Sequence, residues 1–327
     1  MTAAASESLA PFEPRAAREP PAPFEPRAAP EPATPSTLAD RSAALASSSV
    51  QLGLPLPGVR RLFACTPSRL ATFDCPRRYR LTYLQRPAPR KGPPWAHNTV
   101  GAVAHLALHR WWTAPRRART VAHAGTLVER NWLDDGFRHQ EQSALWRHRA
   151  RQWVESYVAQ LDPADEPPGV ERTVAATTAG LAVSGRVDRI DDRGGDLVIV
   201  DYKTGRRPLG PDDARGSLAL AMYAIGASRI FRRPCVRVEL HHLPTGTVAG
   251  FEHSEATLQR HVRRAEATAQ DIVAATDTYA GGADADEVFP PAPGPGCSWC
   301  DVRRHCPQGR EASVERRSWD GLGDTAE

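Results

Sequence analysis

Two carboxylates and a lysine stand at the ends of two short apolar runs in this 327-residue chain. Asp188 closes the run Gly185–Asp188, and Asp201-Tyr202-Lys203 follows a stretch of Leu, Val and Ile thirteen residues later. Neighbouring antiparallel strands joined by a short turn can bring both aspartates together. Such carboxylates repel each other unless a cation lies between them, and hard oxygen ligands select Mg²⁺ or Mn²⁺.

A metal ion held in this way can activate water and stabilise negative charge on a phosphate. Lys203 shares a strand face with Asp201 by the two-residue period, so it can hold the attacking water or neutralise developing charge. Lys91 and Lys203 are the only lysines in an arginine-rich chain, and lysine is the compact cation with a movable pKa. The alternative is a plain turn with a surface ion pair, and Asp188 upstream weighs against it.

The segments Gly185–Ile190 and Val200–Gly205 resemble the RecB-like branch of the PD-(D/E)XK nuclease superfamily, whose pattern is G-x-hydrophobic-D-R-hydrophobic followed by D-Y-K-T-G. The resemblance covers roughly residues 62–310. It implies that Asp188 and Asp201 bind metal and that Lys203 is catalytic. It also implies a restriction-endonuclease-like core sheet flanked by helices, and a phosphodiester hydrolase that is a DNA exonuclease of repair or recombination, acting on ends or single strands.

A histidine lies on a helix expected from Asn98 to Trp112, where Gly101 and His105 share one face. Such a histidine can be a hydrogen-bonded core residue, and His109 four residues later allows a two-histidine zinc face. RecB-like nucleases carry a Gly-x-x-x-His helix ahead of the sheet, with the histidine at the metal site. The resemblance therefore implies that His105 is a metal ligand, and we interpret His109 as structural.

Three of the six cysteines are clustered as Cys297-x2-Cys300-x5-Cys306. The sequence shows no secretory signal, so metal binding is favoured over disulfides. Structural zinc usually uses two local pairs, whereas all-cysteine ligation suits a [4Fe–4S] cluster. Iron–sulfur members of the RecB-like branch add a Cys-Pro-x-x-[Phe/Tyr] helix, which implies that Cys75 is the fourth ligand of a mainly structural cluster. Cys65 and Cys235 fit no such pattern and are expected to be buried thiols.

The resemblance departs from the branch in the helix after the lysine strand. Tyr223 is present as a candidate catalytic residue, but Ala219 stands where the branch has glutamine, which puts one substrate-orienting contact in doubt. Glu171 opens a strand and could reach the site, although a solvated strand residue is the interpretation that we favour. No Walker motif occurs, so any helicase partner would be a separate protein.

The period of the apolar residues predicts an α+β, or mixed α/β, fold. Helices are expected from Thr66 and over residues 98–112, 120–133, 138–161, 212–231 and 255–276. Strands are expected over residues 171–178, 181–190, 196–202, 236–242 and 248–252.

The domain organisation follows from composition as well as from these elements. We expect a disordered Pro/Ala-rich tail over 1–58, a nuclease domain over 59–312 and a flexible tail over 313–327. The nuclease domain divides into a helical part (62–161), a nuclease core (170–280) and an iron–sulfur clasp formed by 295–308 with Cys75.

The net charge of +4 is compatible with DNA as the partner but does not establish it. No run of about 18 apolar residues is present, so we expect no membrane contact and a cytoplasmic location. Two other hypotheses remain open: a non-catalytic DNA-binding iron–sulfur protein with a decayed site, and a CRISPR-associated spacer-processing nuclease.

Overall fold

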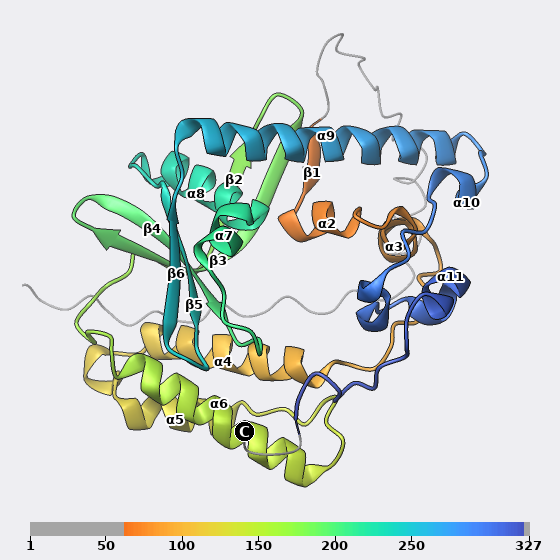
Figure 1. The fold of residues 1–327 in the computed structure, drawn as a ribbon. Coiled ribbons are helices and arrows are strands. Elements are labelled where there is room, and N and C mark those ends of the chain that lie inside the picture. Colours follow the sequence, from red (N-terminus) through yellow and green to blue (C-terminus); the bar gives the residue numbers. More distant parts are fainter. Residues whose placement is uncertain (1–61, 324–327) are drawn as a thin grey trace, which may run out of the picture. The chain divides into compact units, whose positions relative to one another are not determined.

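A computed structural model describes residues 62–323 of the protein (Figure 1). The chain divides into two units, Met1–Gly58 and Val59–Glu327, and the description concerns the second. The predicted tail over residues 1–58 lies outside the described residues, as do residues 324–327.

A mixed six-stranded sheet forms the centre of the domain, with the order β1-β3-β4-β5-β6 and with β2 paired to β3. The pairs β2–β3, β3–β4 and β5–β6 are antiparallel, while β1–β3 and β4–β5 are parallel. The strands are β1 (Phe63–Cys65), β2 (Gly169–Thr177), β3 (Leu181–Arg193), β4 (Asp196–Lys203), β5 (Arg237–His242) and β6 (Thr247–Glu252).

The turn between β3 and β4 fixes the register of the strands that carry Asp188 and Asp201. Arg193 pairs with Asp196, which leaves only Gly194 and Gly195 in the loop, with φ of 66° and 103°. Two consecutive positive φ values are the requirement of a tight hairpin whose twist matches that of its strands, and glycine meets it without strain.

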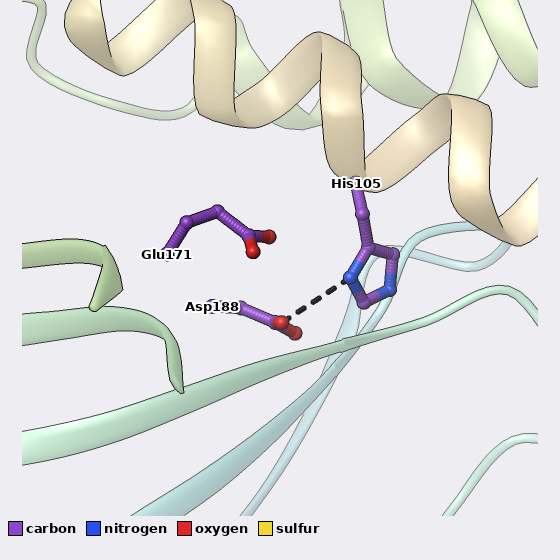
Figure 2. A group of neighbouring side chains, drawn as sticks. All are labelled: His105, Glu171 and Asp188. Carbon is purple, nitrogen blue, oxygen red and sulfur yellow. Dashed lines mark ion pairs between the residues drawn. The ribbon is translucent and has the colours of Figure 1, made fainter. Parts of the chain in front are cut away.

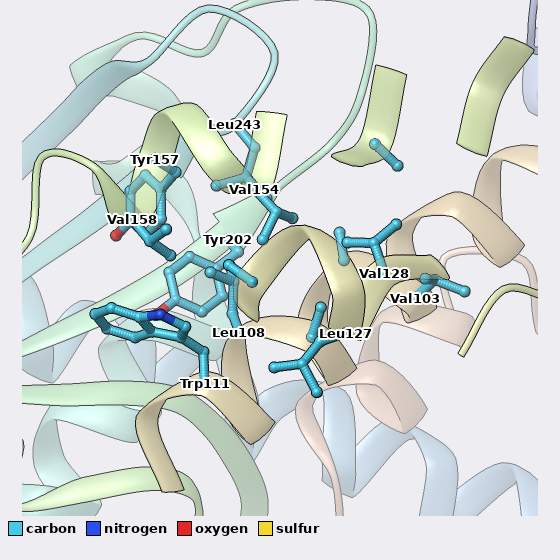
Figure 3. Close-up of a cluster of buried hydrophobic side chains, with 14 of the residues drawn as sticks. Val103, Leu108, Trp111, Leu127, Val128, Val154, Tyr157, Val158, Tyr202 and Leu243 are labelled. Carbon is cyan, nitrogen blue, oxygen red and sulfur yellow. The ribbon is translucent and has the colours of Figure 1, made fainter. Parts of the chain in front are cut away.

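Successive residues of β4 face two different layers of helices, as the two-residue period requires. Val198, Val200 and Tyr202 pack in the core beneath α4 (Ala96–Thr113), α5 (Val121–Arg130) and α6 (Gln140–Val158), which is drawn in Figure 3. Leu197 and Ile199 pack on the other face with α7 (Pro211–Gly216) and α8 (Leu218–Phe231).

A third core joins β1, β2 and β3 to further helices, among which α9 crosses the sheet (Figure 1). Its members include Leu70, Tyr79, Met222 and Ile272. These helices are α2 (Pro67–Thr72), α3 (Pro76–Tyr79), α9 (Glu255–Ala280) and α10 (Ala285–Val288). The last helix, α11 (Pro307–Glu311), begins after Cys306 and is not part of this core. Shorter helical turns span Arg80–Leu84, Arg116–Ala118, Pro295–Trp299 and Arg303–His305.

The sequence placed most elements within a few residues, with one strand missed and two helices divided. The helix expected from Thr66 ends at Thr72, and the chain becomes helical again in α3 from Pro76. β1 is only three residues long, too short to show a period. The helix expected over 212–231 is broken at Ser217, which ends α7 and whose side chain accepts a hydrogen bond from the Leu220 backbone N–H to begin α8. A serine hydroxyl at this position offers the backbone an alternative to a continuous helix.

The segment expected as a flexible tail is packed against the domain as far as Gly323. The Ser318 carbonyl accepts a hydrogen bond from the Ala96 backbone N–H at 3.0 Å, and the Gly323 carbonyl accepts one from Trp146 Nε1 at 2.8 Å. Leu322 is buried in the core under α4 and α6. No helix within residues 62–323 is both long and apolar enough to cross a lipid bilayer.

Candidate active site

His105 on α4 and Asp188 on the inner strand β3 form an ion pair (Figure 2). His105 Nδ1 lies 3.2 Å from Asp188 Oδ1, and Nε2 lies 3.1 Å from the Tyr202 carbonyl oxygen. The other carboxylate oxygen of Asp188 accepts a hydrogen bond from the Tyr202 backbone N–H at 2.8 Å. Burial lowers the pKa of His105, but the hydrogen bond and negative charge of Asp188 outweigh it and the pKa ends above its usual value.

Glu171 on β2 completes a group of three potential metal ligands with His105 and Asp188 (Figure 2). One ligand atom from each side chain lies within 4.8 Å of the other two. The pairs Val170↔Arg189 and Arg172↔Val187 bracket Glu171 and set it opposite Asp188. Its side chain is 19% exposed and forms an ion pair with Arg186, so the expectation of a solvated residue is wrong.

Glu171 also has an uncommon backbone conformation, with φ of 48°. A non-glycine residue at positive φ costs on the order of 1–3 kcal/mol and is held there by its surroundings. Burial and the charge of Asp188 raise the pKa of Glu171 above its usual value.

Asp201 and Lys203 form an ion pair at the end of β4, on the same face as predicted. Burial raises the pKa of Asp201, and the negative charge of Asp188 adds to the increase while Lys203 opposes it. Asp201 is therefore close enough to interact with Asp188, although it is not a member of the three-residue group.

Tyr223 on α8 and Gly185 on β3 are in close contact beside these carboxylates. A Cβ atom on Gly185 would lie 2.4 Å from Tyr223 Cε1, so this position has no room for a side chain. Tyr223, Gly185 and the group of three line one cavity of about 760 Å³, which His109 also lines. Burial and the charges of Asp201 and Asp188 raise the pKa of the Tyr223 hydroxyl.

The donor set fits a hard divalent cation. It offers one imidazole nitrogen and several carboxylate oxygens, the ligands from which Mg²⁺ and Mn²⁺ sites are built. Glu171 and Asp188 converge on the site and Asp201 lies nearby, and burial with the charge of Asp188 raises the pKa values of Glu171 and Asp201, so negative charge is costly there. A bound cation would relieve that cost.

Comparison with known families identifies the fold and the general chemistry. The model of the PD-(D/E)XK nuclease superfamily matches residues 64–307, well over half of the chain. The chain belongs to the PD-(D/E)XK nuclease superfamily. No curated protein matches it. A solved structure titled "Putative exonuclease" from Eubacterium rectale is 12% identical, with a TM-score of 0.32, over 64% of this chain and 91% of that one.

Membership of this nuclease superfamily, with a mixed sheet between helical layers, confirms the expected restriction-endonuclease-like fold. It also supports a divalent metal at the acidic site of this PD-(D/E)XK nuclease. The residue that sequence reasoning missed is Glu171. Its position could have been inferred from the first predicted hairpin, whose register places Glu171 opposite Asp188.

The four cysteines of the expected clasp come from both ends of this nuclease domain. Cys75 and Cys306 are the N-cap residues of α3 and α11, with nearly the same backbone angles (φ −127° and ψ 102°; φ −128° and ψ 100°). Burial raises the pKa of the Cys300 thiol, and the nearby thiols of Cys75 and Cys297 add to the increase. Ala292 and Gly309 donate backbone N–H groups to the sulfurs of Cys75 and Cys306, at 3.5 and 3.3 Å.

Cys65 and Cys235 are buried away from that group, as expected. Burial raises the pKa of Cys65 to about 11 and that of Cys235 to about 12. Both thiols are therefore neutral at physiological pH, which suits small core residues rather than ligands.

Proposed function

We propose that the protein is a metal-dependent deoxyribonuclease, an exonuclease of DNA repair that hydrolyses phosphodiester bonds at DNA ends or in single strands. The observation that carries the proposal is the convergence of His105, Glu171 and Asp188 beside the Asp201–Lys203 pair in a PD-(D/E)XK nuclease. A hard cation and a lysine at one strand end are groups that can catalyse phosphodiester hydrolysis.

His105 and Asp188 are the residues that we assign to the metal ion, with Asp201 and Glu171 as the further carboxylates. A bound Mg²⁺ or Mn²⁺ supplies Lewis acidity toward a phosphate oxygen and toward water. The ring of His105 is held by the Tyr202 carbonyl on one side and by Asp188 on the other. The Tyr202 backbone in turn fixes Asp188, so the ligands of β3 and α4 are positioned by the strand that carries Lys203.

Lys203 and Tyr223 are the groups that act on the substrate in this proposal. The Lys203 side chain is 41% exposed, so its ammonium group can donate hydrogen bonds to the attacking water or to a non-bridging phosphate oxygen. The Tyr223 hydroxyl stays protonated because its pKa is raised, so it can donate to the phosphate as well. Ala219 has no polar side chain with which to orient the substrate, so we assign that role to Tyr223.

The chain itself provides a matched pair for the decisive experiment, because Lys91 is the only other lysine and is exposed. Anaerobically purified protein with Mn²⁺ or Mg²⁺ is expected to cleave end-labelled DNA, and Lys203→Ala is expected to abolish cleavage while DNA binding persists. Lys91→Ala should cleave as the natural protein does. If the metal-loaded protein cuts no DNA end, the enzymatic proposal fails and the non-catalytic DNA-binding alternative takes its place.

The exonuclease part of the proposal has its own test. Linear single strands are expected to be degraded, while a circular single strand of the same sequence should resist. Cleavage of the circle would show an endonuclease and would leave the hydrolytic chemistry intact.

We also propose that Cys75, Cys297, Cys300 and Cys306 bind a [4Fe–4S] cluster with a structural role. Four thiolates around one zinc ion at about 2.3 Å would stand only about 4 Å apart. Within residues 62–323, the cysteines form no group of three with ligand atoms within 4.8 Å, so their spacing is wider than zinc requires. The N–H groups directed at Cys75 and Cys306 also suit thiolate sulfur.

The cluster proposal is tested by the visible absorption spectrum and by iron and sulfide content after anaerobic purification. Cys300→Ser should lose iron and colour, whereas Cys235→Ser, a buried thiol elsewhere, should keep both. A colourless protein that contains zinc would overturn the cluster assignment without affecting the nuclease proposal.

A further inference from the structure

A second and larger cavity, of about 1160 Å³, lies beside the loop that follows Lys203. Most of its walls come from α6, the loop Thr204–Arg207, the C-terminal segment Gly321–Gly323 and the cysteine clasp through Trp299. His97 of α4 and the turn residues Pro244 and Thr245 complete the lining. The strand β4, which carries Lys203, therefore ends at the wall of this second cavity. None of the proposed catalytic residues lines the cavity.

The two cavities are neighbours, separated by the contact between α4 and the loop after β4. Gly101 lines the active-site cavity and Thr204 lines the second one. A Cβ atom on Gly101 would lie 3.1 Å from Thr204 Oγ1, so the glycine permits this close approach. His97, in the second cavity, lies two four-residue steps before His105 on the same helix face, about 12 Å along the axis. An extended chain molecule at the metal site could therefore also occupy the second cavity.

The lining of the second cavity is cationic. It includes Arg149, Arg206, Arg207 and two histidines, and no aspartate or glutamate is among its described lining residues. Arg207 is paired with Asp213, and Arg149 lies over the Trp146 ring at 4.7 Å. Arg206 is exposed and forms no hydrogen bond or ion pair with any residue in 62–323. Its charge is therefore available to an anionic ligand.

The same cavity is also aromatic. Trp146, Trp153 and Trp299 line it, and the Trp146 and Trp153 rings pack edge to face with centroids 5.8 Å apart. Trp153 is only partly buried, which leaves part of its indole open to the cavity. Arginines that track phosphates, combined with indole rings on which bases stack, form the usual binding surface for single-stranded nucleic acid.

We propose that this cavity binds the nucleotides of a DNA single strand adjacent to the phosphodiester at the metal site. Arg206 contacts the backbone phosphates and Trp153 stacks on a base. A single strand is the occupant because duplex bases are stacked on one another and cannot reach an indole in a cavity. This inference rests on the proposed nuclease function and names the residues that hold its substrate.

The test measures DNA binding in full-length protein carrying Lys203→Ala, so that cleavage does not interfere. A short fluorescein-labelled oligothymidylate is titrated by fluorescence anisotropy at several salt concentrations. In this background, Arg206→Ala should weaken binding several-fold and reduce the salt slope by about 0.7, the loss of one phosphate contact. Trp153→Ala should weaken binding about tenfold or more, and Trp153→Phe, which keeps a stacking ring, much less.

Arg147→Ala is the matched control, because Arg147 is exposed on the same helix but does not line the cavity. It should bind as the parent does, and an unlabelled hairpin duplex should compete worse than an unlabelled single strand. The inference is overturned if Arg206→Ala and Trp153→Phe match Arg147→Ala while Trp153→Ala also binds normally. It is overturned as well if the duplex competes best.

The same variants on the natural Lys203 background separate this inference from the nuclease proposal. Arg206→Ala should raise KM for single-stranded DNA with little change in kcat. Cleavage with an unchanged KM would reject the cavity and keep the nuclease. Binding that depends on Arg206 without cleavage under any metal would reject the nuclease and keep the cavity.

Discussion

Arg189 and Asp191, two residues apart on β3, form a two-point ion pair in the interior of the domain. Arg189 Nε lies 2.6 Å from Asp191 Oδ1, and Nη2 lies 2.9 Å from Oδ2. The guanidinium is 3% exposed, and its remaining arm donates to the hydroxyls of Tyr157 and Tyr202 at 3.0 and 3.2 Å. Because Tyr202 stands between Asp201 and Lys203, this buried cation anchors the catalytic strand from its opposite face.

Breaking the Arg189–Asp191 pair should destabilise the domain strongly. Asp191→Asn leaves a buried guanidinium without its counter-charge, and loss of one partner of such a pair costs about 3–5 kcal/mol. The loss of stability is measured as the decrease in the free energy of unfolding by urea denaturation. Asp212→Asn removes the partner of the exposed Arg215 and should change stability little. Equal losses of stability in the two variants would contradict a stabilising role of the buried Arg189–Asp191 pair.

Glu171→Gln should weaken metal binding while keeping the size of the side chain. One of the converging carboxylates is lost, so half-maximal cleavage should need about tenfold more Mn²⁺. The measurement is the dependence of the rate on metal concentration, with direct titration calorimetry as the second readout. An unchanged metal requirement would limit the site to His105, Asp188 and Asp201.

The strained backbone of Glu171 gives a separate expectation for stability. Glycine tolerates a φ of 48° and alanine does not, so Glu171→Gly should be more stable than Glu171→Ala by about 1 kcal/mol. Thermal unfolding of the two variants decides this. The ordinary preference for alanine within a strand would give the opposite order.

Gly185→Ala should impair catalysis through Tyr223. The added methyl would lie 2.4 Å from the tyrosine ring, so the ring must leave its place in the active-site cavity. We expect kcat to fall about tenfold or more, on the scale of losing one oriented donor. Gly180→Ala is the control, because a Cβ there meets open space and activity should be unchanged. Addition of Tyr223→Ala to Gly185→Ala should restore stability but not the rate.

The ionised side chain of Glu239 should make the stability of the folded state sensitive to acid. Burial alone would raise its pKa, but hydrogen bonds from His241, Arg193 and Arg237 outweigh burial and hold the pKa far below its usual value. The stabilisation from a lowered pKa is complete above the unfolded value of about 4.3 and is lost as pH falls toward the folded value. The urea midpoints of the natural protein and Glu239→Gln should therefore differ most near neutral pH and converge below about pH 4. A constant difference would contradict this.

Much of the fold was readable from the sequence because its strands obey a two-residue period. The run that ends in Lys203 alternates between two cores, and the glycine pair before it closes a hairpin, so the strand order around Asp188 and Asp201 followed from local pattern. His105 and Tyr223 were found through the resemblance. Their convergence with the strands depends on helices that pack from opposite faces, which no local spacing reveals.

Glu171 and the C-terminal segment were missed for different reasons. Glu171 reads as one polar residue in a polar strand, and only its pairing opposite Asp188 and its positive φ direct it to the metal site. The segment Ser318–Gly323 has a glycine-containing, loop-like sequence, yet two backbone carbonyls and Leu322 attach it to α4 and α6. Every residue has a backbone carbonyl, so a sequence pattern does not indicate which carbonyl accepts a tertiary hydrogen bond.

The hydrogen bond from Trp146 to Gly323 spans 177 residues of sequence. During synthesis, α6 emerges long before its partner, and at the usual rate of elongation the interval is on the order of ten seconds. Trp146 and the wall of the larger cavity therefore stay uncovered while the whole sheet is being made. A ribosome that stops within the cysteine clasp would release a chain with every proposed metal ligand of the active site but with an open helical layer.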